Sequence, residues 1–231
     1  MSKVKLVVFD IAGTTIYDDG TIGKSFQDAM QFYGYDIPIL KINELMGYKK
    51  TEAIQKMLYE FEPNNDKINN AFINEIHNHF LKLMVQYYNS TDSLYALPNT
   101  LSTFQWLKEQ GIKIGLDTGF PLIITNTIMR RIGWVKNHIV DCVISSDEVE
   151  AGRPDPFMIW EIMKRLEILE CSSVIKVGDT EVDINEGRNA KCLYSIGITT
   201  GAFSRSSLAV YEPSFIIDDL QELIAIVQNV N

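Results

Sequence analysis

Five short apolar segments, separated by patterns of helical spacing, place the strongest constraint on the fold of this chain. The segments are residues 3–9, 112–116, 140–144, 174–177 and 193–196, and each is typical of a buried strand. From about Pro98 onward they alternate with helix-like patterns at residues 101–109, 122–132, 157–166 and 183–189. Nearly continuous apolar strands alternating with helices are typical of a parallel sheet with helices on both faces. The sequence therefore predicts an α/β fold with a mainly parallel, Rossmann-like sheet.

The stretch between the first and second predicted strands breaks this alternation. It contains helical patterns at residues 25–33, 42–46, 52–61 and 67–87, and no convincing strand. We therefore expect a helical domain of residues 17–90 inserted into a core domain of residues 1–16 and 91–231. An insertion after the first strand would lie over the carboxyl ends of the strands, where open α/β sheets bind ligands.

Composition excludes several classes of protein. The 231 residues are 46% hydrophobic and 22% charged, as in a globular chain, and the formal charge of −9 with no basic block argues against a nucleic-acid partner. No apolar run approaches the ~18–20 residues of a membrane span, and the apolar stretch near the start is too short for a secretory signal. Cys142, Cys171 and Cys192 lack the spacing of a zinc site or a disulfide framework. We therefore expect a cytoplasmic protein with reduced cysteines, no membrane partner and no nucleic-acid partner.

Polar residues follow the ends of four predicted strands. Asp10 ends the first, Thr118 and Gly119 follow the second, Arg153 comes after the third, and Asp179 follows the fourth with Asp183 close behind. In a parallel sheet these positions meet at one edge. Clustered carboxylates favour a divalent cation, and Mg²⁺ prefers one or two carboxylates together with phosphate oxygens. Arg and backbone N–H groups also suit phosphate. The pattern predicts Mg²⁺-dependent chemistry on phosphorus, with a carboxylate able to act as nucleophile.

Four segments resemble the motifs of the haloacid dehalogenase superfamily. They are DIAGTT (residues 10–15), LDTGF (116–120), AGRPDP (151–156) and VGDTEVD (177–183), in the family's order. More narrowly they resemble phosphonatase (phosphonoacetaldehyde hydrolase) and its phosphonatase-like relatives, and the helical insert matches the position of that family's cap domain. The resemblance covers essentially the whole chain and implies a Mg²⁺-dependent hydrolase.

The resemblance also implies a role for each motif residue. Asp10 would be the nucleophile that forms an aspartyl-phosphate, and it would bind Mg²⁺ together with the backbone carbonyl of Ala12. Thr118 and the N–H of Gly119 would hold phosphoryl oxygens. Arg153 stands where most of the superfamily has Lys and phosphonatases have Arg, and it would balance the charge on Asp10 and the phosphoryl group.

The remaining acidic motif residues complete the implied metal site. Asp179 would be a metal ligand, and Asp183 a second acidic residue that positions the metal or its waters. The residues Thr180 and Asp183 also have the spacing of a helix capping box.

Position 12 separates this chain from most phosphatases of the superfamily. Those enzymes have an Asp there that protonates the leaving group and later activates water, whereas Ala12 can do neither. Phosphonatases also have Ala and use a cap lysine that forms an imine with the substrate aldehyde. The segment MGYKK (residues 46–50) places Lys50 at that lysine position, although Ala53 stands where phosphonatases have His. Lys50 is therefore expected to face the substrate, and Tyr48 to line the same pocket.

Several functions remain open at this point. The first hypothesis is a phosphonatase-like Mg²⁺-dependent hydrolase of a small phosphorylated or phosphonate metabolite, acting as a monomer or homodimer. The second is phosphonoacetaldehyde hydrolysis with Lys50 as the imine-forming lysine. A non-catalytic protein on the same fold is a third hypothesis, because Ala12 lacks an expected catalytic group. A receiver-like phospho-switch is a fourth, but it would be shorter and would lack the helical insert.

Overall fold

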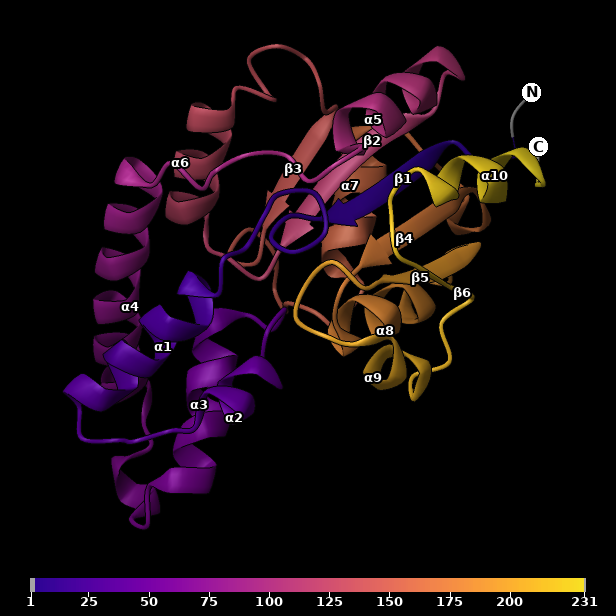
Figure 1. Cartoon of the computed structure of the whole chain (residues 1–231). Helices are drawn as coiled ribbons and strands as arrows, with labels where there is room; N and C mark the ends of the chain where they lie inside the picture. The colour runs from indigo at the N-terminus through magenta and orange to yellow at the C-terminus, as the bar shows by residue number, and fades with distance from the viewer. Residues whose placement is uncertain (1–2, 231) are drawn as a thin grey trace.

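The sheet of this protein has six strands, all parallel, in a computed structural model that describes residues 3–230 (Figure 1). Their order is β3-β2-β1-β4-β5-β6. The strands are β1 (Leu6–Asp10), β2 (Lys113–Thr118), β3 (Cys142–Ser145), β4 (Val174–Gly178), β5 (Tyr194–Ile198) and β6 (Phe215–Ile217). The predicted α/β fold with a parallel sheet is confirmed. The short edge strand β6 was not predicted.

Helices cover both faces of the sheet because its central strands are apolar throughout. Val7 and Phe9 of β1 belong to one buried cluster, and Leu6 and Val8 belong to another. Successive residues of a strand point to opposite faces, so the two clusters lie on opposite sides of the sheet. The covering helices are α5 (Thr100–Glu109), α6 (Leu122–Ile132), α7 (Phe157–Arg165), α8 (Glu181–Asn189), α9 (Arg205–Ala209) and α10 (Glu222–Gln228).

Helix α8 begins two residues earlier than the pattern predicts. Thr180 and Asp183 form the expected capping box, in which each side chain accepts a hydrogen bond from the other's backbone. The N-cap residue of α8 is therefore Thr180, and Glu181 lies in the first turn of the helix.

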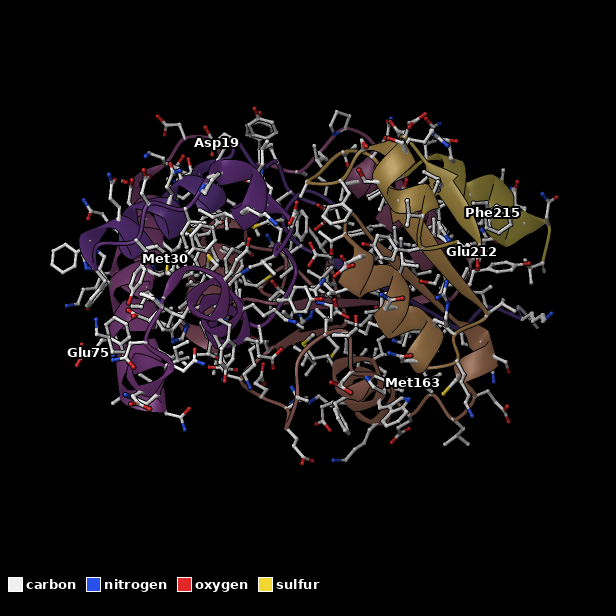
Figure 2. All side chains as sticks on the ribbon, turned by 90° about the horizontal axis from the view of Figure 1, so that it is seen from below. Asp19, Met30, Glu75, Met163, Glu212 and Phe215 are labelled. Atoms are coloured by element: carbon white, nitrogen blue, oxygen red, sulfur yellow. The ribbon has the colours of Figure 1, made fainter. Side chains whose placement is uncertain are left out.

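Four helices form a separate group beyond the carboxyl ends of the strands (Figure 1). They are α1 (Thr21–Phe32), α2 (Ile39–Asn43), α3 (Lys50–Phe61) and α4 (Asn70–Ser90). We call this group the cap. The rings of Phe26 and Phe80 stack inside it with centroids 4.2 Å apart, joining α1 to α4. In Figure 2 the cap, marked by Met30 and Glu75, lies beside the sheet and its helices, marked by Met163 and Phe215.

Three cap helices depart from their predicted positions by three residues or more. Helix α1 starts at Thr21, four residues before its predicted start at residue 25. Helix α2 ends at Asn43, whereas the pattern placed a helix at residues 42–46, and the following loop carries Gly47 at a φ of 85°. Helix α4 starts at Asn70 and not at residue 67, because the Asn69 side chain accepts a hydrogen bond from the Phe72 N–H at 3.1 Å. The domain limits 1–16 with 91–231, and 17–90, stay a prediction, and residues 1, 2 and 231 lie outside the described part. Between residues 3 and 230, no helix has both the length and the apolar character needed to cross a membrane.

Candidate active site

The motif residues meet at the carboxyl ends of β1, β2 and β4, below the cap. Asp10 is the last residue of β1, Thr118 is the last residue of β2, and Asp179 directly follows β4. They line a cavity of about 30 Å³, which is the space of very few water molecules. The predicted site residues that line it are Asp10, Ala12, Lys50, Thr118, Gly119, Arg153 and Asp179. Residues far apart in the sequence are therefore brought together, and the cavity is nearly closed.

Arg153 is the central cation of this site. It comes from the loop between β3 and α7 and is 1% exposed. Its Nη2 lies 2.8 Å from Oδ1 of Asp10, and its Nη1 pairs with Asp183. Burial acts to lower the pKa of Arg153, but the carboxylates of Asp183 and Asp10 outweigh it and raise that pKa well above its ordinary value. The guanidinium is therefore permanently charged and holds Asp10 in a fixed place.

Asp10 and Asp179 are buried carboxyl groups that disfavour each other's charge. Burial, opposed mainly by Arg153, raises the pKa of Asp10 to about 6. Burial, and next the charge of Asp10, raise the pKa of Asp179 well above its ordinary value. Asp179 accepts hydrogen bonds from Thr14 Oγ1 at 3.1 Å and from the Ala202 N–H at 2.7 Å. Within residues 3–230 Asp179 forms no ion pair, so its charge lacks the compensating cation that Arg153 supplies to Asp10.

This donor set fits a hard divalent cation. Asp10, Asp179 and Ala12 line the same cavity, and two carboxylates plus a carbonyl are oxygen ligands of the kind that Mg²⁺ takes. A divalent cation would offset the burial and the nearby carboxylate charges that raise these two pKa values. We infer that Mg²⁺ would be held by Asp10, Asp179 and the carbonyl of Ala12.

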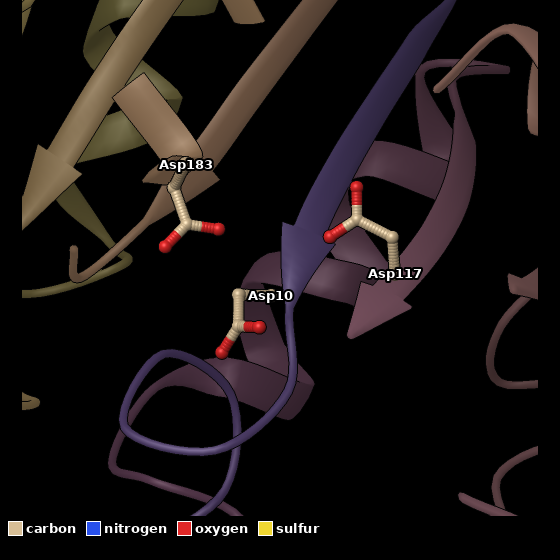
Figure 3. Close-up of side chains that lie close together, drawn as sticks. All are labelled: Asp10, Asp117 and Asp183. Atoms are coloured by element: carbon tan, nitrogen blue, oxygen red, sulfur yellow. The ribbon is translucent and has the colours of Figure 1, made fainter. Parts of the chain in front are cut away.

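A second group of carboxyl oxygens lies nearby but is already neutralised. Single oxygens of Asp10, Asp117 and Asp183 lie within 4.8 Å of one another, and Figure 3 shows these side chains coming from β1, β2 and α8. Lys176 of β4 pairs with Asp117, and its Nζ lies 3.2 Å from Asp183 Oδ1. Arg153 occupies the space between Asp10 and Asp183. The predicted metal role of Asp183 is therefore less favoured by this geometry than a role in holding Arg153.

Sequence reasoning missed the buried group of Lys176, Asp117 and Glu186. The Nζ of Lys176 lies 3.0 Å from Oε2 of Glu186 on α8, and all three residues are fully buried. A usable signal was present, because Lys176 and Asp117 are charges of opposite sign inside otherwise apolar strands. Charges in such positions require each other as partners.

The cap loop before α3 lies directly on the strand ends. A Cβ atom on Gly119 would come within 2.5 Å of the carbonyl oxygens of Gly47 and Tyr48, and a Cβ on Gly47 within 2.5 Å of Thr180 Oγ1. Only glycine permits this approach at both positions. The cap is therefore closed on the sheet.

Lys50, the first residue of α3, enters the cavity from this closed cap. Its side chain is 4% exposed, and its Nζ lies 5.4 Å from the centroid of the Phe26 ring and 5.1 Å from that of Phe120. Burial, and next the charge of Arg153, lower the pKa of Lys50 to about 8. Within the described residues its Nζ makes no hydrogen bond or ion pair.

Tyr48 takes a different place from the one expected. It is not among the residues that line the cavity, and its hydroxyl donates a hydrogen bond of 2.6 Å to Oε1 of Glu181. Glu181 begins α8, so this bond joins the cap to the core. The geometry assigns Tyr48 to cap closure in place of the expected substrate contact.

Comparison with known proteins agrees with this architecture. The pattern of the haloacid dehalogenase-like hydrolase family matches residues 7–197 of the chain. The chain belongs to the haloacid dehalogenase-like hydrolases. The resemblance of its four motifs is thereby confirmed, and the protein is a hydrolase.

Individual relatives of this hydrolase carry phosphonatase names. It is 35% identical over 216 residues to a phosphonoacetaldehyde hydrolase of Parabacteroides distasonis, covering 87% of this chain and 78% of the relative. It is 30% identical over 227 residues to one of Latilactobacillus sakei, covering 94% and 82%. The crystal structure of a phosphonoacetaldehyde hydrolase-like protein from Oleispira antarctica has the same fold, with a TM-score of 0.80, 22% identity, and coverage of 99% and 92%.

Proposed function

We propose that this hydrolase cleaves the carbon–phosphorus bond of a small phosphonate aldehyde, with Lys50 forming an imine and Asp10 attacking phosphorus. The observation that carries the proposal is the setting of Lys50. An amine attacks a carbonyl only in its neutral form, which is populated near neutral pH when the pKa is lowered. Burial between two aromatic rings, with Arg153 nearby, supplies that condition. A lysine that merely binds an anion would work best fully charged.

The phosphorus end of the substrate would lie among Asp10, Thr118 and Arg153. Arg153 is buried and its Nε makes no hydrogen bond with the described residues, so a donor remains for a phosphoryl oxygen. The Asp10 carboxylate, positioned by Arg153, would attack phosphorus in line and form an aspartyl-phosphate that water then hydrolyses. Bound Mg²⁺ would supply positive charge to the phosphoryl oxygens and to Asp10.

The absence of an acid at Ala12 is consistent with this chemistry. The electron pair of the broken carbon–phosphorus bond would pass into the imine and leave an enamine on Lys50. No alkoxide leaves from phosphorus, so no acid is needed at position 12. The phosphonoacetaldehyde hydrolases at 35% and 30% identity support phosphonoacetaldehyde as the first substrate to test.

A second candidate is hydrolysis of a small phosphate monoester by the same Asp10. It is favoured by Ala53, which is fully buried on α3 where phosphonatases have a His. In this case Lys50 would only bind the substrate.

The deciding experiment measures phosphate release from phosphonoacetaldehyde with Mg²⁺ in the wild type, Lys50→Arg and Lys49→Arg. We expect Lys50→Arg to lose at least about 10³-fold in rate, because it removes the covalent nucleophile. The matched control Lys49→Arg lies outside the cavity and should stay close to the wild type. Borohydride in the presence of substrate should inactivate the wild type by reducing the imine. Release of phosphate only from monoesters, with no borohydride effect, would replace this proposal by the second candidate.

A further inference from the structure

Imine chemistry at Lys50 needs a group that moves protons, and the family's usual acid–base position is Ala12. Forming the imine expels the aldehyde oxygen as water, and releasing the product adds water again. Each step is faster when a positioned side chain gives or takes the proton. The His that phosphonatases have near this lysine is replaced by Ala53. A different residue must therefore do this work.

Asp18 lies at the right place in the fold. It belongs to the linker between β1 and α1, directly before the cap, and it lines the same cavity as Lys50 and Asp10. Its side chain is half-buried, and its Oδ1 accepts a hydrogen bond from the Gly20 N–H at 3.0 Å. This bond fixes the carboxyl group.

The other carboxyl groups of the cavity have different partners. Three Asp side chains line it within the described residues: Asp10, Asp18 and Asp179. Asp10 is paired with Arg153, and Asp179 belongs to the proposed metal site. Asp18 is therefore the carboxyl group left for the lysine end of the cavity.

The charges around Asp18 suit a proton carrier. Burial, and then the charge of Asp19, raise its pKa, while the hydrogen bond from the Gly20 N–H and then the charge of Lys50 act in the opposite direction. Tyr88 of α4 also interacts electrostatically with Asp18 and stays neutral, because burial raises the pKa of its phenol. A carboxyl group of raised pKa beside an amine of lowered pKa can keep one proton between them.

We infer that Asp18 is the acid–base residue that transfers protons to and from the imine formed at Lys50. This inference rests on the proposed carbon–phosphorus hydrolysis and names the group that replaces the acid missing at Ala12.

The proton balance can be followed through the cycle. The neutral amine of Lys50 adds to the aldehyde carbon, and one of its own protons passes to the oxygen. The acid form of Asp18 gives that oxygen a second proton, so it leaves as water while the C=N bond of the protonated imine forms. Cleavage of the carbon–phosphorus bond leaves its electron pair in the enamine. Protonation of the enamine carbon and addition of water then release acetaldehyde and the neutral amine, with no net gain of protons. The proton released when water hydrolyses the aspartyl-phosphate restores the acid form of Asp18.

Acetaldehyde in D₂O tests the imine steps without phosphorus chemistry. An enzyme that forms the Lys50 enamine exchanges the methyl protons of acetaldehyde for deuterium, which proton NMR follows directly. We expect Asp18→Asn to slow both this exchange and phosphate release from phosphonoacetaldehyde by about 10²–10⁴-fold, the usual contribution of a positioned acid or base. Asp18→Glu should recover part of both rates.

Asp28→Asn is the matched control. Asp28 lies on α1, where it pairs with Lys24 at 2.8 Å outside the cavity, so both rates should stay near the wild type. Equal affinity of Asp18→Asn and wild type for inorganic phosphate, measured by calorimetry, shows that the site of the variant remains folded.

The outcomes separate the two proposals. A wild type that releases phosphate and exchanges acetaldehyde, with Asp18→Asn within about threefold of it in both assays, overturns the role of Asp18 alone. If Asp18→Asn slowed phosphate release but not deuterium exchange, the proposed role of Asp18 would also be overturned, because the imine steps would then be independent of Asp18. A wild type that does neither reaction overturns the proposed function and this inference together.

Discussion

Two buried groups of opposite charge, Asp10 and Lys50, line the same cavity, and burial moves their pKa values toward each other. Burial raises the pKa of Asp10 to about 6 and lowers that of Lys50 to about 8. Each shift disfavours the charged form, as expected for removal from water. Arg153 adds to the lowering at Lys50 and opposes the raising at Asp10. At the scale of single residues, Arg153 therefore lowers the pKa values of both proposed reactive groups, Asp10 and Lys50.

The pH dependence of the reaction follows from Lys50. Its neutral fraction increases as pH rises through about 8, so we expect kcat/KM for phosphonoacetaldehyde to fall about tenfold per pH unit below that value. Initial rates of phosphate release between pH 6 and 9 measure the profile. A phosphate monoester provides the comparison, because its hydrolysis needs no neutral amine. A flat profile for the aldehyde across this range would contradict an imine role.

At the scale of secondary-structure elements, the side chain of Lys176 connects strands β4 and β2 with helix α8. It lies in β4, pairs with Asp117 of β2 across the intervening β1, and approaches Asp183 and Glu186 of α8. The same α8 holds Arg153 through Asp183. The position of Arg153 in the site therefore depends on a buried ionic group behind it.

Replacing Lys176 by Met should strongly destabilise the protein. The substitution leaves buried carboxylates without their cation, which costs about 3–5 kcal/mol in free energy of unfolding. Urea denaturation at neutral pH measures this change. The control Lys113→Met breaks the exposed pair with Asp141, whose N–O distance is 3.2 Å, and should cost only about 0–1 kcal/mol. Equal effects of the two substitutions would show that the group around Lys176 contributes little.

At the scale of the whole molecule, close backbone contacts and hydrogen bonds join the cap to the core, including bonds from two arginines of α6 to the end of α4. Gly47 and Gly119 permit the contacts, and the Tyr48 hydroxyl bonds to Glu181. A cavity of about 30 Å³ cannot admit a metabolite in this state, so the cap must open for binding and release. The free energy of closure then contributes to apparent substrate affinity.

Removing the Tyr48 hydroxyl should favour the open cap. A hydrogen bond to a carboxylate contributes about 1.5–3 kcal/mol, so Tyr48→Phe should raise KM by about tenfold or more with a smaller change in kcat. Amide hydrogen exchange of residues 46–50 should speed up in the same variant. Tyr59→Phe is the control, because that side chain is exposed and makes no hydrogen bond with the described residues. An unchanged KM in Tyr48→Phe would show that the bond does not hold the cap closed.

The fold was largely predictable because the hydrophobic pattern of each strand and helix can be read from its own residues, without knowing which other elements it packs against. The strands of the predicted core are buried on both faces, so their runs of Val, Ile and Leu mark them directly. Strand β6 was not predicted because three residues at a sheet edge are too few to show a hydrophobic pattern. Helix α2 was misplaced because its five residues span little more than one turn, so periodicity defines its ends poorly.

The sequence by itself determined the parallel sheet, the helical insert and the convergence of Asp10, Thr118, Arg153 and Asp179, since strand ends of a parallel sheet must share an edge. Only the tertiary structure decided the partner of each charge: Arg153 with Asp10 and Asp183, Lys176 with Asp117, and Tyr48 with Glu181. It also decided the pKa of Lys50, which the adjacent residues do not control. Pairing and desolvation arise from residues distant in the chain, and their energies depend on separations of a few ångströms that no local pattern contains.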